Sequence, residues 1–96
     1  MSEIKKVAVL IKRKQDLFEG LRTSLGLAVE NLYTHMFVLD VEVNLTDEYQ
    51  ENLEWLDELE CQYYSNNKSN ISYGFIYLNY EEIVKKLETM DLVIPF

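Results

Sequence analysis

The chain has 96 residues, with 17 acidic side chains, nine lysines and arginines, and a formal net charge of −8. This length suits one domain with one hydrophobic core, so we expect residues 1–96 to form a single domain. The acidic excess argues against nucleic-acid binding, which needs a cationic face. No apolar run approaches the roughly 20 residues that span a bilayer, which argues against a membrane protein.

The cysteine content and the N-terminus predict the compartment. The single cysteine, Cys61, cannot form an internal disulfide, so the chain is not a disulfide-stapled secreted scaffold. The first residues, Met-Ser-Glu-Ile-Lys-Lys, lack the long apolar segment of a signal peptide. Together these features predict a cytoplasmic protein.

The first third of the chain predicts a strand, a helix and a second strand. Residues 6–11 are a continuous apolar run of the kind found in strands buried on both faces, and residues 34–41 contain a second such run. Asp16 is expected to cap the helix between them. Gly20 and Gly26 weaken this helix and would let it pack closely on a sheet or on another subunit. Its apolar residues recur at helical spacing: Leu17, Phe18, Leu21, Leu25, Ala28, Val29 and Leu32.

A second helix is expected to begin at Thr46 or Asp47, where Asp47 and Gln50 have capping-box spacing. Its outer surface is strongly acidic from residue 48 to residue 60, and we expect solvent to cover it unless a basic partner does. The apolar stripe of this helix consists of Tyr49, Leu53, Leu56 and Leu59, with Trp55 near the edge. After the helix, residues 61–64 predict a short strand.

The last third of the chain predicts a polar loop, a short strand, a helix and a final strand. Residues 65–72 are polar turn-formers with few apolar anchors, so we expect this loop to be mobile. Residues 73–78 predict an extended segment. Asn79 is expected to cap a third helix, with Glu82 at the capping-box position. Residues 92–96 predict a terminal strand, where Pro95 is tolerated because a strand end can lack one donor.

Strands that alternate with helices predict βαβ units, hence an α/β fold with a mainly parallel open sheet of four or five strands and helices on both faces. The right-handed crossover rule then favours a flavodoxin-like or closely related topology. Ligands of such sheets bind beyond the C-terminal ends of the strands. We therefore expect the loops 12–15 and 65–72 to lie at the binding edge.

Three stretches resemble a known family. They are the opening Lys-Lys-Val-Ala-Val-Leu-Ile-Lys, the helix Leu-Arg-Thr-Ser-Leu-Gly-Leu-Ala-Val-Glu-Asn-Leu, and the closing segment from Tyr-Glu-Glu-Ile-Val-Lys-Lys to Leu-Val-Ile-Pro-Phe. In this order they resemble the DsrE-like proteins, which include the DsrE, DsrF and DsrH subunits of sulfur metabolism. The resemblance implies a small parallel α/β fold, assembly into homo-oligomers or hetero-oligomers with related subunits, and intracellular sulfur relay by a cysteine persulfide. We expect no cofactor.

The resemblance is incomplete at the residue that would carry sulfur. The family's active cysteine corresponds to a position near Ser65, and a serine oxygen cannot hold a persulfide. Cys61 lies four residues upstream and is the one residue of the chain that could serve as the catalytic persulfide carrier, with Lys12, Arg13 and Lys14 as candidate electrostatic helpers. The alternative is that Cys61 is a small buried residue, as free cysteines often are, with Glu58 and Glu60 disfavouring its thiolate.

Three further groups of residues are candidates for binding. Lys12, Arg13 and Lys14 form a basic loop before a helix N-terminus, which predicts an anion-binding or partner-binding site, with a solvated loop as the alternative. His35 has no second histidine and no acid at ligand spacing, so we expect no metal site. The seven tyrosines suit a subunit interface. Two functions therefore stay open: a DsrE-like sulfur-relay protein, or a non-catalytic oligomeric interaction module that binds a protein partner or small anion.

Overall fold

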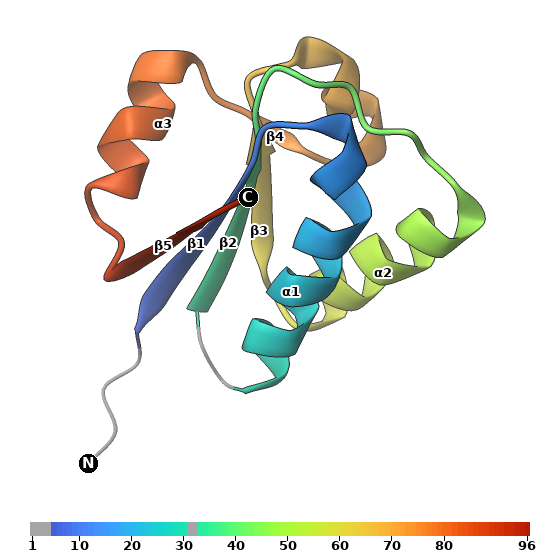
Figure 1. Cartoon of the computed structure of the whole chain (residues 1–96), viewed down its shortest axis with the longest axis horizontal. Coiled ribbons are helices and arrows are strands. Elements are labelled where there is room, and N and C mark those ends of the chain that lie inside the picture. The colour runs from blue at the N-terminus through green and yellow to red at the C-terminus, as the bar shows by residue number, and fades with distance from the viewer. Residues whose placement is uncertain (1–4, 31–32) are drawn as a thin grey trace.

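A computed structural model describes residues 5–30 and 33–96 of the chain. It contains one sheet of five parallel strands in the order β4-β3-β2-β1-β5 (Figure 1). This confirms the prediction of a mainly parallel α/β fold. The strands are β1 (Lys6–Ile11), β2 (Tyr33–Val38), β3 (Gln62–Ser65), β4 (Ile76–Tyr77) and β5 (Leu92–Pro95).

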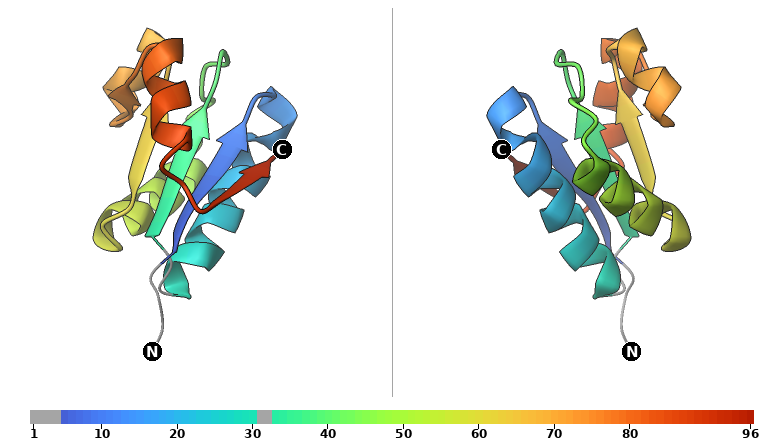
Figure 2. Two further views of the ribbon diagram at one scale, coloured as in Figure 1. Left: turned by 90° about the vertical axis from the view of Figure 1, so that its left-hand side faces the viewer. Right: turned by 90° about the vertical axis from the view of Figure 1, so that its right-hand side faces the viewer.

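Helices cover both faces of the sheet, as the sequence predicts. Helices α1 (Leu17–Val29) and α2 (Asp47–Glu58) lie side by side on one face, and α3 (Tyr80–Leu87) lies alone on the other (Figures 1 and 2). The steps from β1 to β2 and from β2 to β3 run in one direction, whereas the connection through α3 returns across the sheet to β5. Right-handed crossovers therefore place α3 opposite α1 and α2. Among the described residues, no helix has the length and apolar character needed to cross a membrane.

The position of β1 in the sheet differs from that in a flavodoxin-like sheet. In a flavodoxin-like sheet the first strand lies between the second and the third. Here β1 lies between β2 and β5, so the chain changes direction across the sheet at β1. The switch point therefore falls where β1 and β5 end, next to the loop that begins at Lys12.

The sheet carries two apolar cores of unequal size. The larger core joins β1, β2 and β3 to α1 and α2 and includes Val9, Leu21 and Met36, all fully buried. The smaller core lies under α3, where Ile83 packs with Phe37 and Tyr64. Because α3 has only eight residues, it covers only part of its face.

The two glycines of α1 have different environments. A Cβ atom on Gly20 would lie 2.2 Å from Cδ1 of Ile11, so Gly20 lets α1 approach β1 closely, as predicted. Gly26 is exposed, and apart from its chain neighbours and the backbone of its own helix no atom lies within 4 Å of the position of its Cβ. Val29, expected on the apolar face, is 67% exposed. Leu32 lies outside the described residues.

The helix caps agree with the predictions in part. Asn79 caps α3 in a complete capping box with Glu82, as predicted. Thr46, rather than Asp47, caps α2, and its Oγ1 accepts a hydrogen bond from the Tyr49 N–H. Asp16 precedes α1 but its side chain does not cap the helix, because its carboxylate pairs with Arg13 Nε at 2.9 Å.

The segment 65–72 contains more structure than the predicted polar loop. After Ser65 ends β3, residues Lys68–Tyr73 form a 3-10 helix, η2. Asn70 anchors it and is completely buried. Its Oδ1 accepts from the Val43 N–H at 2.8 Å, and its Nδ2 donates to Val41 O and Ser65 Oγ at 3.0 and 2.9 Å. A buried amide supplies the anchor that apolar side chains do not.

Candidate functional site

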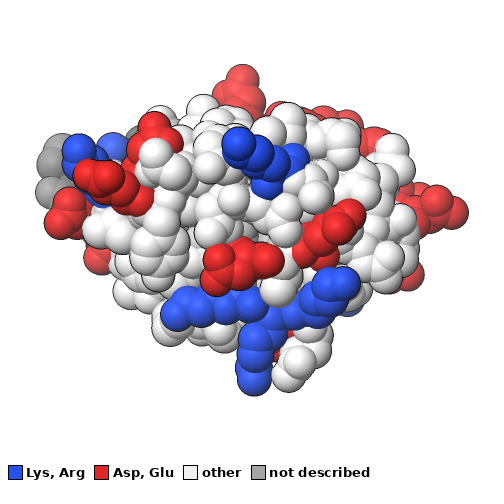
Figure 3. Space-filling model, turned by 90° about the horizontal axis from the view of Figure 1, so that it is seen from above, with Lys and Arg blue, Asp and Glu red and all other residues white. Residues whose placement is uncertain are grey.

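The C-terminal ends of the strands carry the basic loop, as the topology predicts. Lys12, Arg13 and Lys14 are exposed, and basic side chains gather along one side of this end of the molecule (Figure 3). Arg13 is paired with Asp16, whose carboxylate stands before α1. Lys14 lines a cavity of about 390 Å³ between the starts of α1 and α2. An anion or partner site here stays a prediction, carried mainly by the two lysines.

Ser65, at the position where the resemblance places a cysteine, has a structural role. It is 1% exposed. Its Oγ accepts hydrogen bonds from the Asn67 N–H at 3.0 Å and from Asn70 Nδ2 at 2.9 Å. These bonds hold the turn after β3 to the end of that strand. Asp40, in the segment after β2, bonds Asn66 of the same turn through its N–H and carboxylate. A side chain so enclosed has no access to a substrate.

Cys61 lies just before β3, at the N-terminal edge of the sheet. It is partly buried against the larger core, and its Sγ is 3.8 Å from Leu59 O. Burial raises the pKa of its thiol, an effect that outweighs the opposing hydrogen bond with the Thr34 backbone. At neutral pH the group is therefore a thiol rather than the reactive thiolate.

Cys61 and the basic loop do not form one site. Lys12 follows the end of β1 and Cys61 precedes the start of β3. Because β1 and β3 both run parallel to β2, Lys12 lies at the C-terminal ends of the strands and Cys61 lies at their N-terminal ends. Lys12, Arg13 and Lys14 cannot act as electrostatic helpers of a Cys61 thiolate.

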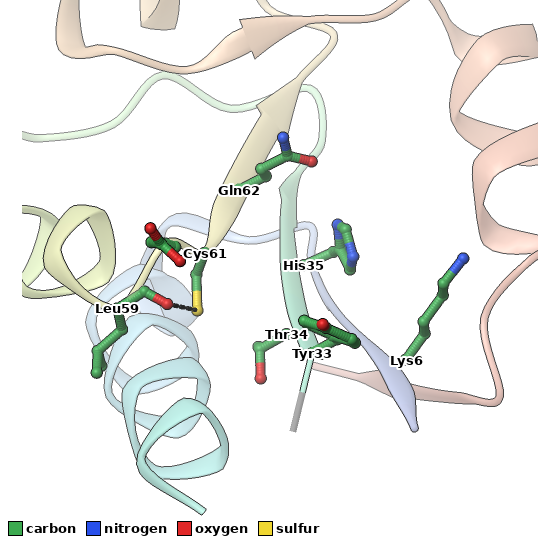
Figure 4. A pocket seen from close by; sticks show the side chains of 8 residues that line it. Lys6, Tyr33, Thr34, His35, Leu59, Cys61 and Gln62 are labelled. Carbon is green, nitrogen blue, oxygen red and sulfur yellow. Dashed lines mark hydrogen bonds between the residues drawn. The ribbon is translucent and has the colours of Figure 1, made fainter. Parts of the chain in front are cut away.

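A cavity of about 330 Å³ wraps around the N-terminal edge beside Cys61. Lys6, Tyr33 and His35 lie together on one side of β2, and Cys61 lies on the other (Figure 4). Successive strand residues point to opposite faces, and His35 pairs in register with Gln62, so Cys61 faces α1 and α2 while His35 faces α3. The cavity therefore does not combine cysteine and histidine as a nucleophile–base pair.

A longer groove of about 630 Å³ runs between α1 and α2. Gly26 opens it, because nothing fills the space beyond its Cα. The Arg22 guanidinium lies over the Phe18 ring at one side, 5.9 Å from its centroid. The groove is lined by Phe18, Arg22, Leu25, Gly26, Val29, Glu30, Glu48, Asn52 and Trp55.

Sequence reasoning missed both of these concave surfaces. The cavity beside His35 had no signal, because the lysines near it, Lys6 of β1 and Lys86 of α3, are far apart in the chain and come together only in this strand order. The groove had a weak signal, since Gly26 was expected to allow close packing, Val29 falls on the predicted apolar face of α1 and Trp55 falls at the edge of the α2 stripe. Nothing in the spacing shows that α1 and α2 leave these residues uncovered.

No protein-family model matches this chain, and no curated protein is similar to it at a significant level. The fold defines a class, small α/β proteins with an all-parallel five-stranded sheet and a switch point at the first strand. Fold class alone does not determine function. The function has to be argued from the groove and the cavity.

Proposed function

We propose that the protein is a non-catalytic interaction module that binds a basic amphipathic helix of a protein partner in the groove between α1 and α2. The observation that carries this proposal is Trp55, which is 60% exposed on the wall of the groove. Tryptophan is enriched among the residues that dominate binding energy. With Val29 and Phe18 it gives the groove an apolar surface that water covers in the free chain.

The charge of α2 specifies the partner. Every acidic residue of this helix is exposed, and the helix has no lysine or arginine. A symmetric dimer through the same surface would bring two acidic helices together, which like-charge repulsion opposes. The charged residues that line the groove are Glu30, Glu48 and Arg22, and with the exposed acids of α2 they give this surface an acidic excess that a basic helix complements. The acids are Asp47, Glu48, Glu51, Glu54, Asp57 and Glu58.

The shape of the groove suits a helix. An amphipathic helix binds by laying side chains three and four residues apart into an apolar groove. Gly26 lets such side chains approach the α1 backbone without meeting another atom. Glu48 and Glu30 line the groove and can pair with lysines on the flanks of the bound helix.

The single tryptophan makes the proposal testable. The probes are two synthetic amphipathic peptides, one of leucine and lysine and one of leucine and glutamate. We expect the lysine peptide alone to shift the Trp55 emission to shorter wavelength, because binding removes the indole from water. Gly26→Leu fills the groove from an open position and should weaken binding at least about tenfold.

Matched charge variants separate the groove from general attraction to an acidic protein. Glu48→Gln should weaken binding by roughly two- to fivefold, whereas Glu88→Gln, beyond the end of α3, should leave it unchanged. Equal binding by Gly26→Leu and the unmodified chain would contradict the proposal. A homodimer in sedimentation that Gly26→Leu dissociates would instead make a second copy the occupant.

Persulfide relay by Cys61 is the second candidate, favoured by one observation. The cysteine lines a cavity rather than lying fully buried. In this step the Cys61 thiolate attacks the outer sulfur of a donor persulfide. A new S–S bond forms as the donor S–S bond breaks, and the donor leaves as a thiolate.

Iodoacetamide and a persulfide donor test the relay. Fast alkylation of Cys61 in the native protein at neutral pH, with a stable gain of one sulfur by mass spectrometry, would support it. Alkylation of Cys61 only after unfolding would contradict the relay hypothesis. We expect slow alkylation that accelerates as the pH rises, because burial raises the pKa of the thiol.

A further inference from the structure

The α3 face of the sheet carries a polar cluster around the single histidine. The His35 ring stacks on Tyr64 with centroids 5.9 Å apart, and its Nδ1 lies 3.2 Å from the Tyr64 hydroxyl oxygen. The Tyr64 hydroxyl donates to Gln62 Oε1. Because this hydroxyl hydrogen is used, His35 Nδ1–H donates to the Tyr64 oxygen. In the neutral ring Nε2 is then unprotonated.

Two lysines, Lys6 and Lys86, lie close enough to His35 for their charges to affect it. Burial lowers the pKa of His35, and the charges of Lys86 and Lys6 lower it further. Lys6 comes from β1 and points to the same side of β2 as His35 (Figure 4). Lys86 comes from α3 and lies over the Tyr64 ring, 5.2 Å from its centroid.

Among the described residues, neither lysine has a carboxylate partner within 4.0 Å. Within residues 5–30 and 33–96, the only ion pair within 4.0 Å joins Arg13 and Asp16. Asp91 is near Lys6, but its Oδ2 accepts a hydrogen bond from the Lys6 backbone N–H at 2.8 Å. In a chain of net charge −8, two unpaired ammoniums beside a histidine form a local positive site.

We propose that Lys6, His35, Lys86 and the Gln62 amide bind the doubly charged oxyanion of a small phosphate monoester, for which inorganic sulfate is the probe, and that a proton binds His35 Nε2 with it. Two lysines and an imidazolium match a dianion better than a carboxylate, and each contact is a charge-assisted hydrogen bond. Lys6, His35 and Gln62 line one part of the cavity of about 330 Å³, which has the size of a small-molecule site, and Lys86 lies over the Tyr64 ring that stacks on His35. This site lies on the opposite face from the groove, so it is independent of the partner proposal.

The other titratable groups that line or flank the cluster are consistent with this assignment. The Tyr64 hydroxyl stays neutral, because burial raises its pKa to about 12. Tyr33 lines the same cavity with an exposed ring. Glu60 lines the cavity at the end next to Cys61 and would repel the anion there, toward the lysines.

The experiment titrates the protein with sodium sulfate against sodium chloride of equal ionic strength, because sulfate keeps its double charge across the pH range. The single His35 Hε1 resonance reports the imidazole, and backbone amide shifts report affinity. We expect sulfate to move the His35 titration to higher pH and to bind roughly tenfold more tightly at pH 5.5 than at pH 7.5. Acetate should have little effect.

Substitutions separate this site from general anion attraction. Lys6→Gln and Lys86→Gln should each weaken sulfate binding by roughly fivefold, whereas Lys85→Gln, on the same helix as Lys86, should not. His35→Gln should bind equally at both pH values. An unchanged His35 titration, or equal losses in Lys85→Gln and Lys86→Gln, would overturn the proposal. All of these variants should keep the leucine–lysine peptide affinity.

Discussion

Alanine at each of the two glycines of α1 should change stability in opposite directions. At Gly26 the new methyl group meets no atom within 4 Å apart from its chain neighbours and its own helix backbone, so only helix propensity changes. The free energy of unfolding should therefore rise by about 1 kcal/mol. At Gly20 the same gain opposes a clash, since the Cβ would lie 2.2 and 2.4 Å from two carbons of Ile11. Ile11 is fully buried, and overpacking of this kind destabilises by about 1–3 kcal/mol.

The difference between the two variants isolates the packing cost, because the propensity gain is common to both. We expect Gly20→Ala to be less stable than Gly26→Ala by about 2 kcal/mol. Urea unfolding followed by circular dichroism measures this as a midpoint difference of roughly 1 M, with equal slopes. If both variants were stabilised to the same degree, α1 would not lie as close to β1 as the structure places it.

Three further predictions concern other parts of the fold. Asn70→Ala should destabilise by about 3 kcal/mol in urea unfolding, because a buried side chain loses three hydrogen bonds, while Ser69→Ala nearby stays within about 0.5 kcal/mol. Asn79→Ala should lower stability by about 1 kcal/mol in the same assay, because the α3 capping box is lost. The folded pKa of His35 is depressed, so the stability it contributes is present above the unfolded pKa of about 6.5 and is lost as pH falls through the folded pKa. Unfolding midpoints at pH 7.5 and 5.5 should show this loss, and His35→Gln should lack it.

Local patterns were sufficient to predict most of the fold. The apolar run of β1, the capping box at Asn79 and the alternation of strands with helices are short-range signals, and each corresponds to an observed element. The 3-10 helix after β3 could not be predicted in this way. Its anchor, Asn70, is polar, and its partners at Val41 and Val43 are nearly 30 residues away in sequence.

The candidate site was less accessible to sequence reasoning, for a topological reason. Loop 12–15 was placed correctly at the C-terminal edge because parallel strands fix which ends share an edge. The same rule places Cys61, at the start of the predicted strand 61–64, at the other end of the strands from the basic loop, and the structure confirms this. The cluster of Lys6, His35 and Lys86 depends on strand order, which spacing does not encode.

The unequal covering of the two faces connects the two proposals. On one face of the sheet α3 supplies only eight helical residues, whereas on the other face α1 and α2 share the covering. The N-terminal half of β2 therefore keeps His35 and Tyr33 accessible next to Lys6. On the opposite face coverage is sufficient, but Gly26 removes side-chain volume between the two helices and leaves Trp55 in water. The groove and the cavity each arise where a helix supplies too little side-chain volume. The two surfaces differ in charge, since the groove lies along the acidic helix α2 and the cavity lies beside the basic cluster around His35. This difference is the reason that we propose a cationic helix for the groove and a dianion for the cavity.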